Sequence, residues 1–322
     1  MQKMLFIYNP RAGTGQIRAS LSYILEEFAQ HDMQITVHPT LGAGDAVKTV
    51  RKTGKKYDLI VCSGGDGTLD EVVTGMLDGG FRKPVGYIPG GSTNDFASSL
   101  GIPKQMRKAA ASIARGNVYS CDLGKLNDGY FVYVGAFGAF TEVSYKTSQD
   151  AKNMLGHLAY VLEGMKSLSA LKSWEMTFHS EEKQGHGMFL YGMITNSDSV
   201  GGFKGITGQN VDMNDGVFEV TLIRMPENII EYPEIVNSIL TGEPSELVIT
   251  FKTARVEFFS QEEVPWTRDG EFGGNHTHVV IENLHGALPI LLGEDVDILS
   301  VDDAEEKERE LLSDETEADD RK

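Results

Sequence analysis

Three aspartates, Asp66, Asp95 and Asp122, each follow a short apolar run of the kind that forms a buried strand. If these strands are parallel, their carboxyl ends meet at one edge of a sheet, and we expect the three carboxylates to converge there. Such an acidic cluster is unfavourable unless it binds a cation, directly or through water, or holds protons on groups of raised pKa. A lone aspartate in any of these places would more often be a helix cap or a turn residue.

The stretch Gly64-Gly65-Asp66-Gly67-Thr68 joins a strand expected at residues 59–62 to a helix whose apolar positions begin at Leu69. Three glycines in four positions allow backbone N–H groups to face a bound anion, and the helix start adds further donors, so the loop suits a phosphate. Neither a GxxxxGK[ST] loop nor a GxGxxG loop after a strand is present. Because Asp66 would repel a triphosphate, we expect a divalent cation between them. The alternative is a glycine-rich turn with a solvated aspartate.

This glycine loop resembles the GGDGT signature shared by diacylglycerol kinases, sphingosine and ceramide kinases, and NAD kinases with their phosphofructokinase relatives. Taken with the motifs described below, the chain resembles the soluble bacterial diacylglycerol kinases, a family of lipid kinases, from about residue 3 to about residue 300. The resemblance implies ATP and Mg²⁺ as cofactors. It also favours a catalytic magnesium network, partly through water, at Asp66, Asp95 and Asp122.

The same resemblance implies a set of ATP contacts in the loops that follow the first strands. Residues 9–13 resemble the family's NP-x-x-G loop, and Thr40 stands where the family's threonine contacts ATP. Residues 90–97 resemble G-T-x-N-D-F-A, with Ser92 in place of the usual threonine; the hydroxyl is kept, so we expect function to be kept. The expected ATP contacts are Asn9, Pro10, Arg11, Ala12, Gly13, Thr40, Gly64, Gly65, Asp66, Gly67, Thr68, Leu69, Asp70 and Ser92.

Asp269-Gly270-Glu271 matches the family's D-G-E motif, in which the acidic pair supplies the general base. Phosphoryl transfer needs alignment, charge neutralisation and a base for the attacking hydroxyl, and a carboxylate on the opposite wall of a cleft fits the last role. We expect Asp269 to be the base and Glu271 its partner, although the order could be reversed. By itself the tripeptide is typical of a hairpin turn.

Residues 211–217 resemble the family's second, structural magnesium site. The resemblance implies a carboxylate from Asp215 and main-chain carbonyls from Asp212 and Val217, which are oxygen ligands suited to a hard cation. The alternative is a turn that opens the next strand.

Strands and helices alternate in the first part of the chain, with strands expected at residues 3–9, 34–38, 59–62, 85–88 and 118–121. Later strands follow one another with few helices, at 130–138, 174–179, 188–196, 217–223, 247–251, 256–259 and 277–282. The pattern predicts an N-terminal doubly wound α/β domain and a mostly antiparallel β-sandwich domain, with the active site in the cleft between them. We assign residues 1–125 and 287–312 to the first domain, 126–286 to the second, and 313–322 to a disordered acidic tail. The return of the chain through 287–292 and 296–299 is implied by the resemblance.

Composition limits the partners of this protein. A formal charge of −18 over 322 residues weighs against nucleic acid. The two cysteines, one of them in a predicted core strand, favour a reducing cytoplasm, and no apolar run is long enough to span a membrane. We therefore expect a cytoplasmic, peripheral protein that meets its lipid substrate transiently at the inner face of the membrane, and that could form a homodimer.

Apolar residues recur at helical spacing between residues 146 and 172, beside four lysines and two acidic residues. This predicts an amphipathic helix, which either packs on the β domain or touches the bilayer and admits the lipid.

The leading hypothesis is an ATP-dependent lipid kinase that converts diacylglycerol to phosphatidate. A sphingoid base, a ceramide or another lipid alcohol is an open alternative acceptor. NAD is disfavoured because the Asn-Glu motif of NAD kinases is missing from the sequence. A hypothesis of another class is an inactive nucleotide or lipid sensor, against which the acidic residues count.

Overall fold

The computed structural model describes residues 1–138, 172–200, 203–204 and 211–293. The helix expected between 146 and 172, the strand at 296–299 and the acidic tail at 313–322 lie outside the described residues, as does most of the 287–312 segment. Within the described residues, no helix is long and apolar enough to cross a membrane.

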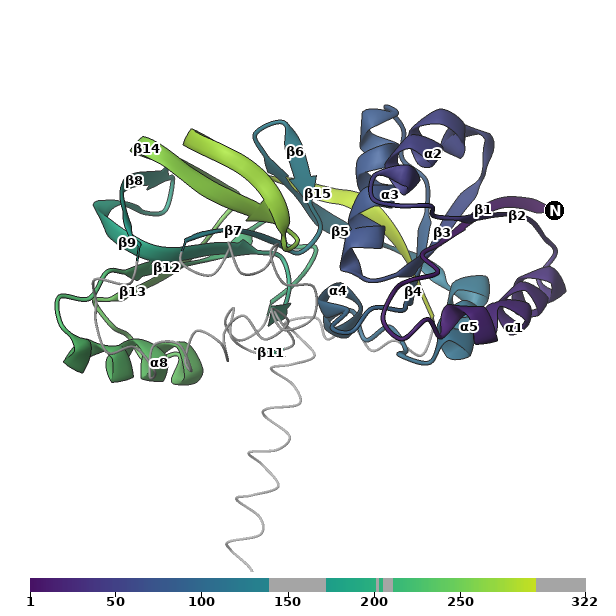
Figure 1. Cartoon of the computed structure of the whole chain (residues 1–322), viewed down its shortest axis with the longest axis horizontal. Coiled ribbons are helices and arrows are strands. Elements are labelled where there is room, and N and C mark those ends of the chain that lie inside the picture. The colour runs from purple at the N-terminus through teal and green to yellow at the C-terminus, as the bar shows by residue number, and fades with distance from the viewer. Residues whose placement is uncertain (139–171, 201–202, 205–210, 294–322) are drawn as a thin grey trace, which may run out of the picture.

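The N-terminal half is an α/β layer structure, shown at the right of Figure 1. Its parallel strands stand in the order β4-β3-β1-β2, with two pairs of packed helices, α2 with α3 and α1 with α5, on opposite sides of the sheet. The central strand β3 is buried along its whole length, which explains its continuous apolar run. The elements are β1 (Gln2–Tyr8), α1 (Ile17–Gln30), β2 (Met33–Pro39), α2 (Asp45–Thr53), η1 (Gly54–Lys56), β3 (Leu59–Gly64), α3 (Asp66–Asp78), β4 (Val85–Pro89), α4 (Asp95–Ser99) and α5 (Met106–Arg115).

The second half is β-rich and mostly antiparallel, as expected. Strands β7, β9, β8 and β14 are each hydrogen-bonded to the next and close into a ring around a core rich in aromatic side chains, including Trp174, Phe178 and Trp266. The elements are β5 (Asn117–Leu126), β6 (Gly129–Phe131), β7 (Val134–Gly138), β8 (Trp174–Ser180), β9 (Gln184–Thr195), β10 (Ser199–Val200), β11 (Phe203–Lys204), β12 (Phe218–Arg224), η3 (Ile229–Glu231), α8 (Tyr232–Thr241), β13 (Val248–Thr253), β14 (Arg255–Arg268) and β15 (Glu271–Leu292).

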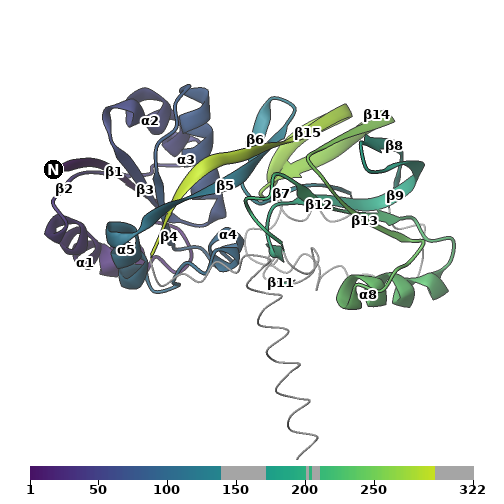
Figure 2. The same cartoon turned by 180° about the vertical axis from the view of Figure 1, so that it is seen from behind.

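Two long strands, β5 and β15, run from one half into the other, and Figure 2 shows both crossing between them. They pair antiparallel, and β15 also pairs in parallel with β4 at Ile290 and Val85. The strands expected separately at 277–282 and 287–292 are therefore one strand. The expectation of a fifth parallel strand at 118–121 is wrong, because β5 is an antiparallel partner of β15.

Glu219 offers a test of the packing in the β-rich half. It is 5% exposed in β12, and burial raises its pKa to about 7 although the Lys252 ammonium lies 3.1 Å from its Oε1. In an unfolded chain glutamate has a pKa of about 4.3. The folded protein thus binds this proton more tightly, so its free energy of unfolding falls as the pH rises through this interval.

We therefore expect the unfolding free energy of Glu219→Gln, relative to that of the wild type, to increase by about 2–3 kcal/mol between pH 5 and pH 8. Urea unfolding followed by circular dichroism at several pH values measures this difference. Glu262→Gln, at an exposed position, is the control and should follow the wild type. Parallel pH curves for Glu219→Gln and the wild type would show that this carboxyl is not perturbed.

Candidate active site

A cleft of about 660 Å³ lies between the two halves and takes lining residues from both. Eleven of the fourteen predicted ATP contacts line it, as do both residues predicted to supply the base. The predicted residues in the lining are Asn9, Arg11, Ala12, Gly13, Thr40, Gly65, Asp66, Gly67, Thr68, Asp70, Ser92, Asp95, Asp269 and Glu271. Lining residues that the sequence did not single out include Leu41, Glu71, Asn94, Tyr133, Val200 and Thr267.

Three predicted ATP contacts are not in the lining: Pro10, Gly64 and Leu69. Leu69 is fully buried in the core of the α/β half, because it lies one turn inside helix α3 and faces the sheet. Gly64 is the last residue of β3. The helix starts at Asp66, earlier than expected, so its first turn carries Asp66, Gly67 and Thr68.

Close packing of three loops explains why glycine occurs at their contacts. A Cβ on Gly91 would lie 2.6 Å from the Cα of Gly65, and a Cβ on Gly13 would lie 2.5 Å from the carbonyl oxygen of Gly90. Gly13 also has a φ of +53°, which residues other than glycine rarely adopt. The loops after β1, β3 and β4 therefore form one surface around the start of α3, where backbone N–H groups and the helix dipole favour an anion.

Tyr87 contacts two of these loops, those after β3 and β4, from the core of the α/β half. It is fully buried in β4, and its hydroxyl lies 3.4 Å from Asp66 Oδ1 and 3.3 Å from Asn94 Oδ1. Asn94, at a φ of +54°, closes its loop through both groups of its side-chain amide, which bond to the N–H and the carbonyl of Gly91. The role of Tyr87 could not be found from the sequence, since it depends on tertiary contacts, whereas Asn94 belongs to the motif at residues 90–97.

Asp66 and Asp95 are directly connected. The backbone N–H of Asp95 donates to Asp66 Oδ2 at 3.1 Å, and the hydroxyl of Ser199 donates to Asp95 Oδ1 at 2.7 Å. Burial, reinforced by the charge of Asp95, raises the pKa of Asp66 to about 7. Burial and the nearby charge of Asp269 also raise the pKa of Asp70. Negative charge is therefore unfavourable at this wall unless a cation compensates it.

The cleft carries a large excess of negative charge. Among the described residues that line it, Arg11 is the single lysine or arginine, against six carboxylates: Asp66, Asp70, Glu71, Asp95, Asp269 and Glu271. One of the six, Glu71, is used in the fold, because its carboxylate accepts the N–H groups of Gly44 and Ala46 at the start of α2. Within the described part of the chain, no three histidine, cysteine or acidic side chains lie close enough to form a complete metal cage.

Asp269 is held in place by the backbone it faces. It is 6% exposed, with a φ of +48°, and its carboxylate accepts the N–H groups of Val132, Tyr133 and Val134 at 2.6–3.0 Å. These bonds interrupt the strand expected at 130–138, which the structure divides into β6 and β7. Burial raises the pKa of Asp269 to about 6, against the lowering effect of the three N–H groups.

Glu271 reaches toward the glycine loop from the opposite wall. A Cβ on Gly67 would lie 4.0 Å from Glu271 Oε1, so this carboxylate is next to the first turn of α3. The D-G-E motif and the glycine loop, about 200 residues apart in the sequence, therefore face the same space.

Asp122 does not join the acidic cluster, which corrects the prediction for that residue. It lies within the antiparallel strand β5 instead of following a parallel strand, and it is not in the lining of the cleft. Its fully buried carboxylate accepts hydrogen bonds from the N–H groups of Gly216 and Gly286, from Asn283 Nδ2, and bonds to His285 Nδ1. These contacts tie residues 212–217 to β15.

The predicted structural magnesium ligands lie together in this 212–217 loop, at a distance from the cleft lining. Asp215 accepts the N–H of Val217 at 3.1 Å and faces the Lys252 ammonium at 3.4 Å. The carbonyl of Val217 accepts from Asn283 Nδ2. The loop is thus held by protein contacts, and an ion bound at Asp215 would have to compete with Lys252.

Comparisons with known proteins agree with this geometry. Residues 3–126 match the diacylglycerol kinase catalytic domain. The chain is 34% identical over 295 residues to a diacylglycerol kinase of Bacillus subtilis (strain 168), covering 87% of this chain and 97% of that protein. It is 31% identical over 271 residues to one of Staphylococcus carnosus (strain TM300), covering 83% and 88%. A crystal structure of a candidate diacylglycerol kinase from Bacillus anthracis str. Sterne superposes with a TM-score of 0.78 at 26% identity, covering 92% and 96%.

Proposed function

This chain belongs to the diacylglycerol kinase family of lipid kinases, and from that premise we propose that ATP is its phosphate donor and diacylglycerol its acceptor. In this reaction the acceptor hydroxyl attacks the γ-phosphorus, the bond from that phosphorus to the β-phosphate oxygen breaks, and phosphatidate and ADP form. The observation that carries the proposal is the cleft itself, which places the start of α3 on one wall and Asp269 and Glu271 on the other.

The wall built by the loops after β1, β3 and β4 suits the phosphates of ATP. The N–H groups at the start of α3 supply donors, and Arg11 is placed in the lining to add positive charge. Ser92 lines the same wall, so the hydroxyl expected at this position is present. Thr40, also in the lining, is the proposed contact at the end of β2.

A magnesium ion fits the chemistry of this wall. The six carboxylates of the lining leave a triphosphate uncompensated, and the raised pKa values of Asp66 and Asp70 show how unfavourable their charges are without a cation. Mg²⁺ is commonly bound through one or two carboxylates with phosphates and water, so a complete protein cage is not needed. When bound, the ion would supply positive charge against the phosphates and against the charge that develops during transfer. We propose Asp66 and Asp95 as the residues that hold it, and a second, structural ion at Asp215, Asp212 and Val217.

Asp269 is the proposed general base. Its three backbone hydrogen bonds hold it rigidly at the cleft, and a pKa of about 6 lets it be ionised at neutral pH while still able to accept a proton. Glu271 is more exposed and is the proposed partner that orients the acceptor hydroxyl. Opening and closing of the cleft would control the access of water.

We further propose that the enzyme acts in the cytoplasm and meets its lipid transiently at the inner face of the membrane, as a peripheral protein. The acceptor must be drawn from a bilayer, because a diacyl lipid does not dissolve in water. The assignment of residues 1–125 with 287–312 and of 126–286 to two domains, and the assembly as a homodimer, are part of the same proposal.

The experiment that tests the function uses labelled ATP, Mg²⁺ and mixed micelles that contain diacylglycerol, sphingosine, ceramide or no acceptor lipid, with NAD as a water-soluble acceptor. Label is expected in phosphatidate alone. Transfer to another lipid alcohol in preference to diacylglycerol would change the acceptor. Transfer to none of them would contradict the proposed reaction and favour a sensor.

A further inference from the structure

We propose that Ser199 is a positioning residue, whose hydroxyl sets the place of Asp95 and, through it, of Asp66 in the nucleotide cleft. The inference rests on the proposed function, because it gives these two carboxylates their task. It adds a requirement that the β-rich half supplies a part of the metal and nucleotide wall.

The contact is short and buried. Ser199 Oγ donates to Asp95 Oδ1 at 2.7 Å, and the two residues are 1% and 2% exposed. Ser199 belongs to β10, beyond the end of β9, whereas Asp95 is the first residue of α4, 104 positions earlier. The N–H of Asp95 in turn donates to Asp66 Oδ2. One hydroxyl from the opposite half thus fixes the orientation of a carboxylate whose backbone holds the next one.

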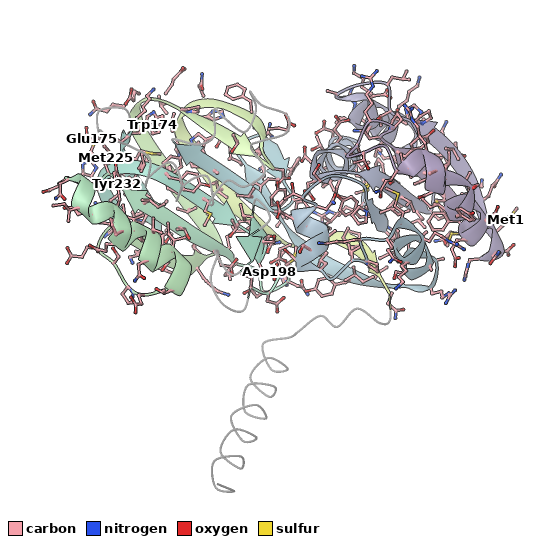
Figure 3. The ribbon with its side chains drawn as sticks, turned by 60° about the horizontal axis from the view of Figure 1, so that its bottom comes forward. Met1, Trp174, Glu175, Asp198, Met225 and Tyr232 are labelled. Carbon is pink, nitrogen blue, oxygen red and sulfur yellow. The ribbon has the colours of Figure 1, made fainter. Side chains whose placement is uncertain are left out.

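A neighbouring pair of hydroxyls, on Ser197 and Ser99, lies at the same contact between the two halves. The Oγ atoms of Ser197 and Ser99 lie 2.6 Å apart, and Ser197 Oγ also donates to the carbonyl of Ser199 at 2.7 Å. Figure 3 labels Asp198, which lies between Ser197 and Ser199 in the chain, where the two halves of the molecule meet. Ser197 therefore holds the backbone of Ser199, and the control is Ser180, a buried serine outside the cleft lining whose hydroxyl donates to the carbonyl of Lys183.

The segment that carries Ser199 is anchored to the backbone that holds the proposed base. The N–H of Asn196 donates to the carbonyl of Tyr133 at 3.0 Å, and the N–H of Tyr133 donates to Asp269 at 3.0 Å. Hydrogen bonds and a short stretch of chain therefore connect Asp269 on one wall with Asp95 and Asp66 on the other. A displacement of residues 196–199 would therefore change the spacing between the proposed base, Asp269, and the proposed metal ligands.

Loss of the hydroxyl should weaken the binding of Mg-nucleotide specifically. Hydrogen bonds to a charged group are stronger than neutral ones, so loss of the Ser199 hydroxyl should loosen the orientation of the Asp95 carboxylate. Ser199 Oγ bonds to Asp95 and not to Asp269 or Glu271, so the KM for the acceptor lipid should not follow. A role in folding alone would lower stability and leave the Mg²⁺ requirement unchanged.

The test compares Ser199→Thr with Ser199→Val, because these variants share the same added bulk and differ in one hydroxyl. The measured quantity is the Mg²⁺ concentration that gives half of the thermal stabilisation by ADP. We expect Ser199→Val to raise it at least about tenfold over Ser199→Thr, in keeping with one charged hydrogen bond. Ser199→Thr and the control Ser180→Ala should stay within about threefold of the wild type, and KM for diacylglycerol in mixed micelles should change less than about threefold in all variants.

Equal Mg²⁺ requirements for the threonine and valine variants, or an equal shift in Ser180→Ala, would overturn the proposal. If both bulkier variants fail to fold, Ser199→Ala against Ser180→Ala gives the same comparison. A double-mutant cycle of Ser199→Ala and Asp95→Ala on unfolding of the ligand-free protein tests the contact independently of activity. Coupling below about twofold in the unfolding equilibrium constant would remove Ser199 from this role. Absence of any ADP effect on the wild type would instead contradict the proposed nucleotide.

Discussion

Asp66→Asn is expected to abolish phosphate transfer and, at the same time, to make the ligand-free protein more stable at pH 8. Burial and the charge of Asp95 raise the pKa of Asp66 to about 7, so the ionised carboxylate destabilises the folded state above that pH. A neutral amide removes this destabilisation but cannot balance a divalent cation. We expect a rise in Tm of about 2–6 °C without ligand and a loss of activity of at least about a thousandfold.

Thermal melting with and without Mg-ADP, together with the labelled-ATP assay, measures both effects. Wild-type Tm should rise on addition of Mg-ADP, and that of Asp66→Asn should not. Asp78 lies at the exposed end of the same helix, outside the cleft lining. Asp78→Asn is therefore the matched control, and its ligand-free Tm and its activity should equal those of the wild type. Full activity of Asp66→Asn, or a Tm below that of the wild type together with intact Mg-ADP binding, would contradict this account.

This expected opposition between stability and activity explains why a sequence pattern could predict residues of the cleft wall at the start of α3. Loops such as 64–68 and 90–97 keep glycines and acidic residues that a stable turn does not require, and their purpose is local: a strand ends, N–H groups face outward and a helix begins. Local requirements of this kind are written in consecutive residues. The parallel direction of β1 to β4 and the residues at their ends followed from the same reasoning.

Asp122 shows where that reasoning stops. Like Asp66, it comes after an apolar run that predicts a strand, yet this run pairs antiparallel with β15, which comes about 160 residues later. Strand direction depends on that distant partner, so the local pattern could not exclude β5 from the parallel set. The same long pairing merges two expected strands into β15 and carries the chain between the halves.

The contacts between the two halves were equally hard to predict from the sequence. Ser199 has no motif around it, and Val132 to Val134 look like the middle of a strand. Their roles arise because each meets an aspartate from far away in the chain, at Asp95 and Asp269. The sequence could therefore identify the two acidic motifs but not the groups that orient them.

Asp269→Asn is expected to lower kcat by about 10²–10⁴, the range that a general base contributes. Its amide would also direct a donor at one of the three N–H groups that now bond to the carboxylate, so a lower Tm is expected as well. Binding of Mg-ADP, measured as the rise in Tm that the ligand causes, should persist, because Asp269 lies on the wall opposite to α3. This combination separates a lost base from an unfolded protein.

The pH dependence decides between Asp269 and Glu271. Burial raises the pKa of Asp269 to about 6, so a base at this position is protonated, and kcat falls, as the pH drops below about 6. The assay uses saturating Mg-ATP, since titration of Asp66 would otherwise enter through metal binding. The residual rate of Asp269→Asn should be flat between pH 5 and pH 8, whereas Glu271→Gln should keep the wild-type profile at a rate lower by about tenfold to a hundredfold. If the profile disappears in Glu271→Gln and survives in Asp269→Asn, the roles are reversed: the rigid aspartate then serves to shape the loop at Val132 to Val134, and the more exposed glutamate takes the proton.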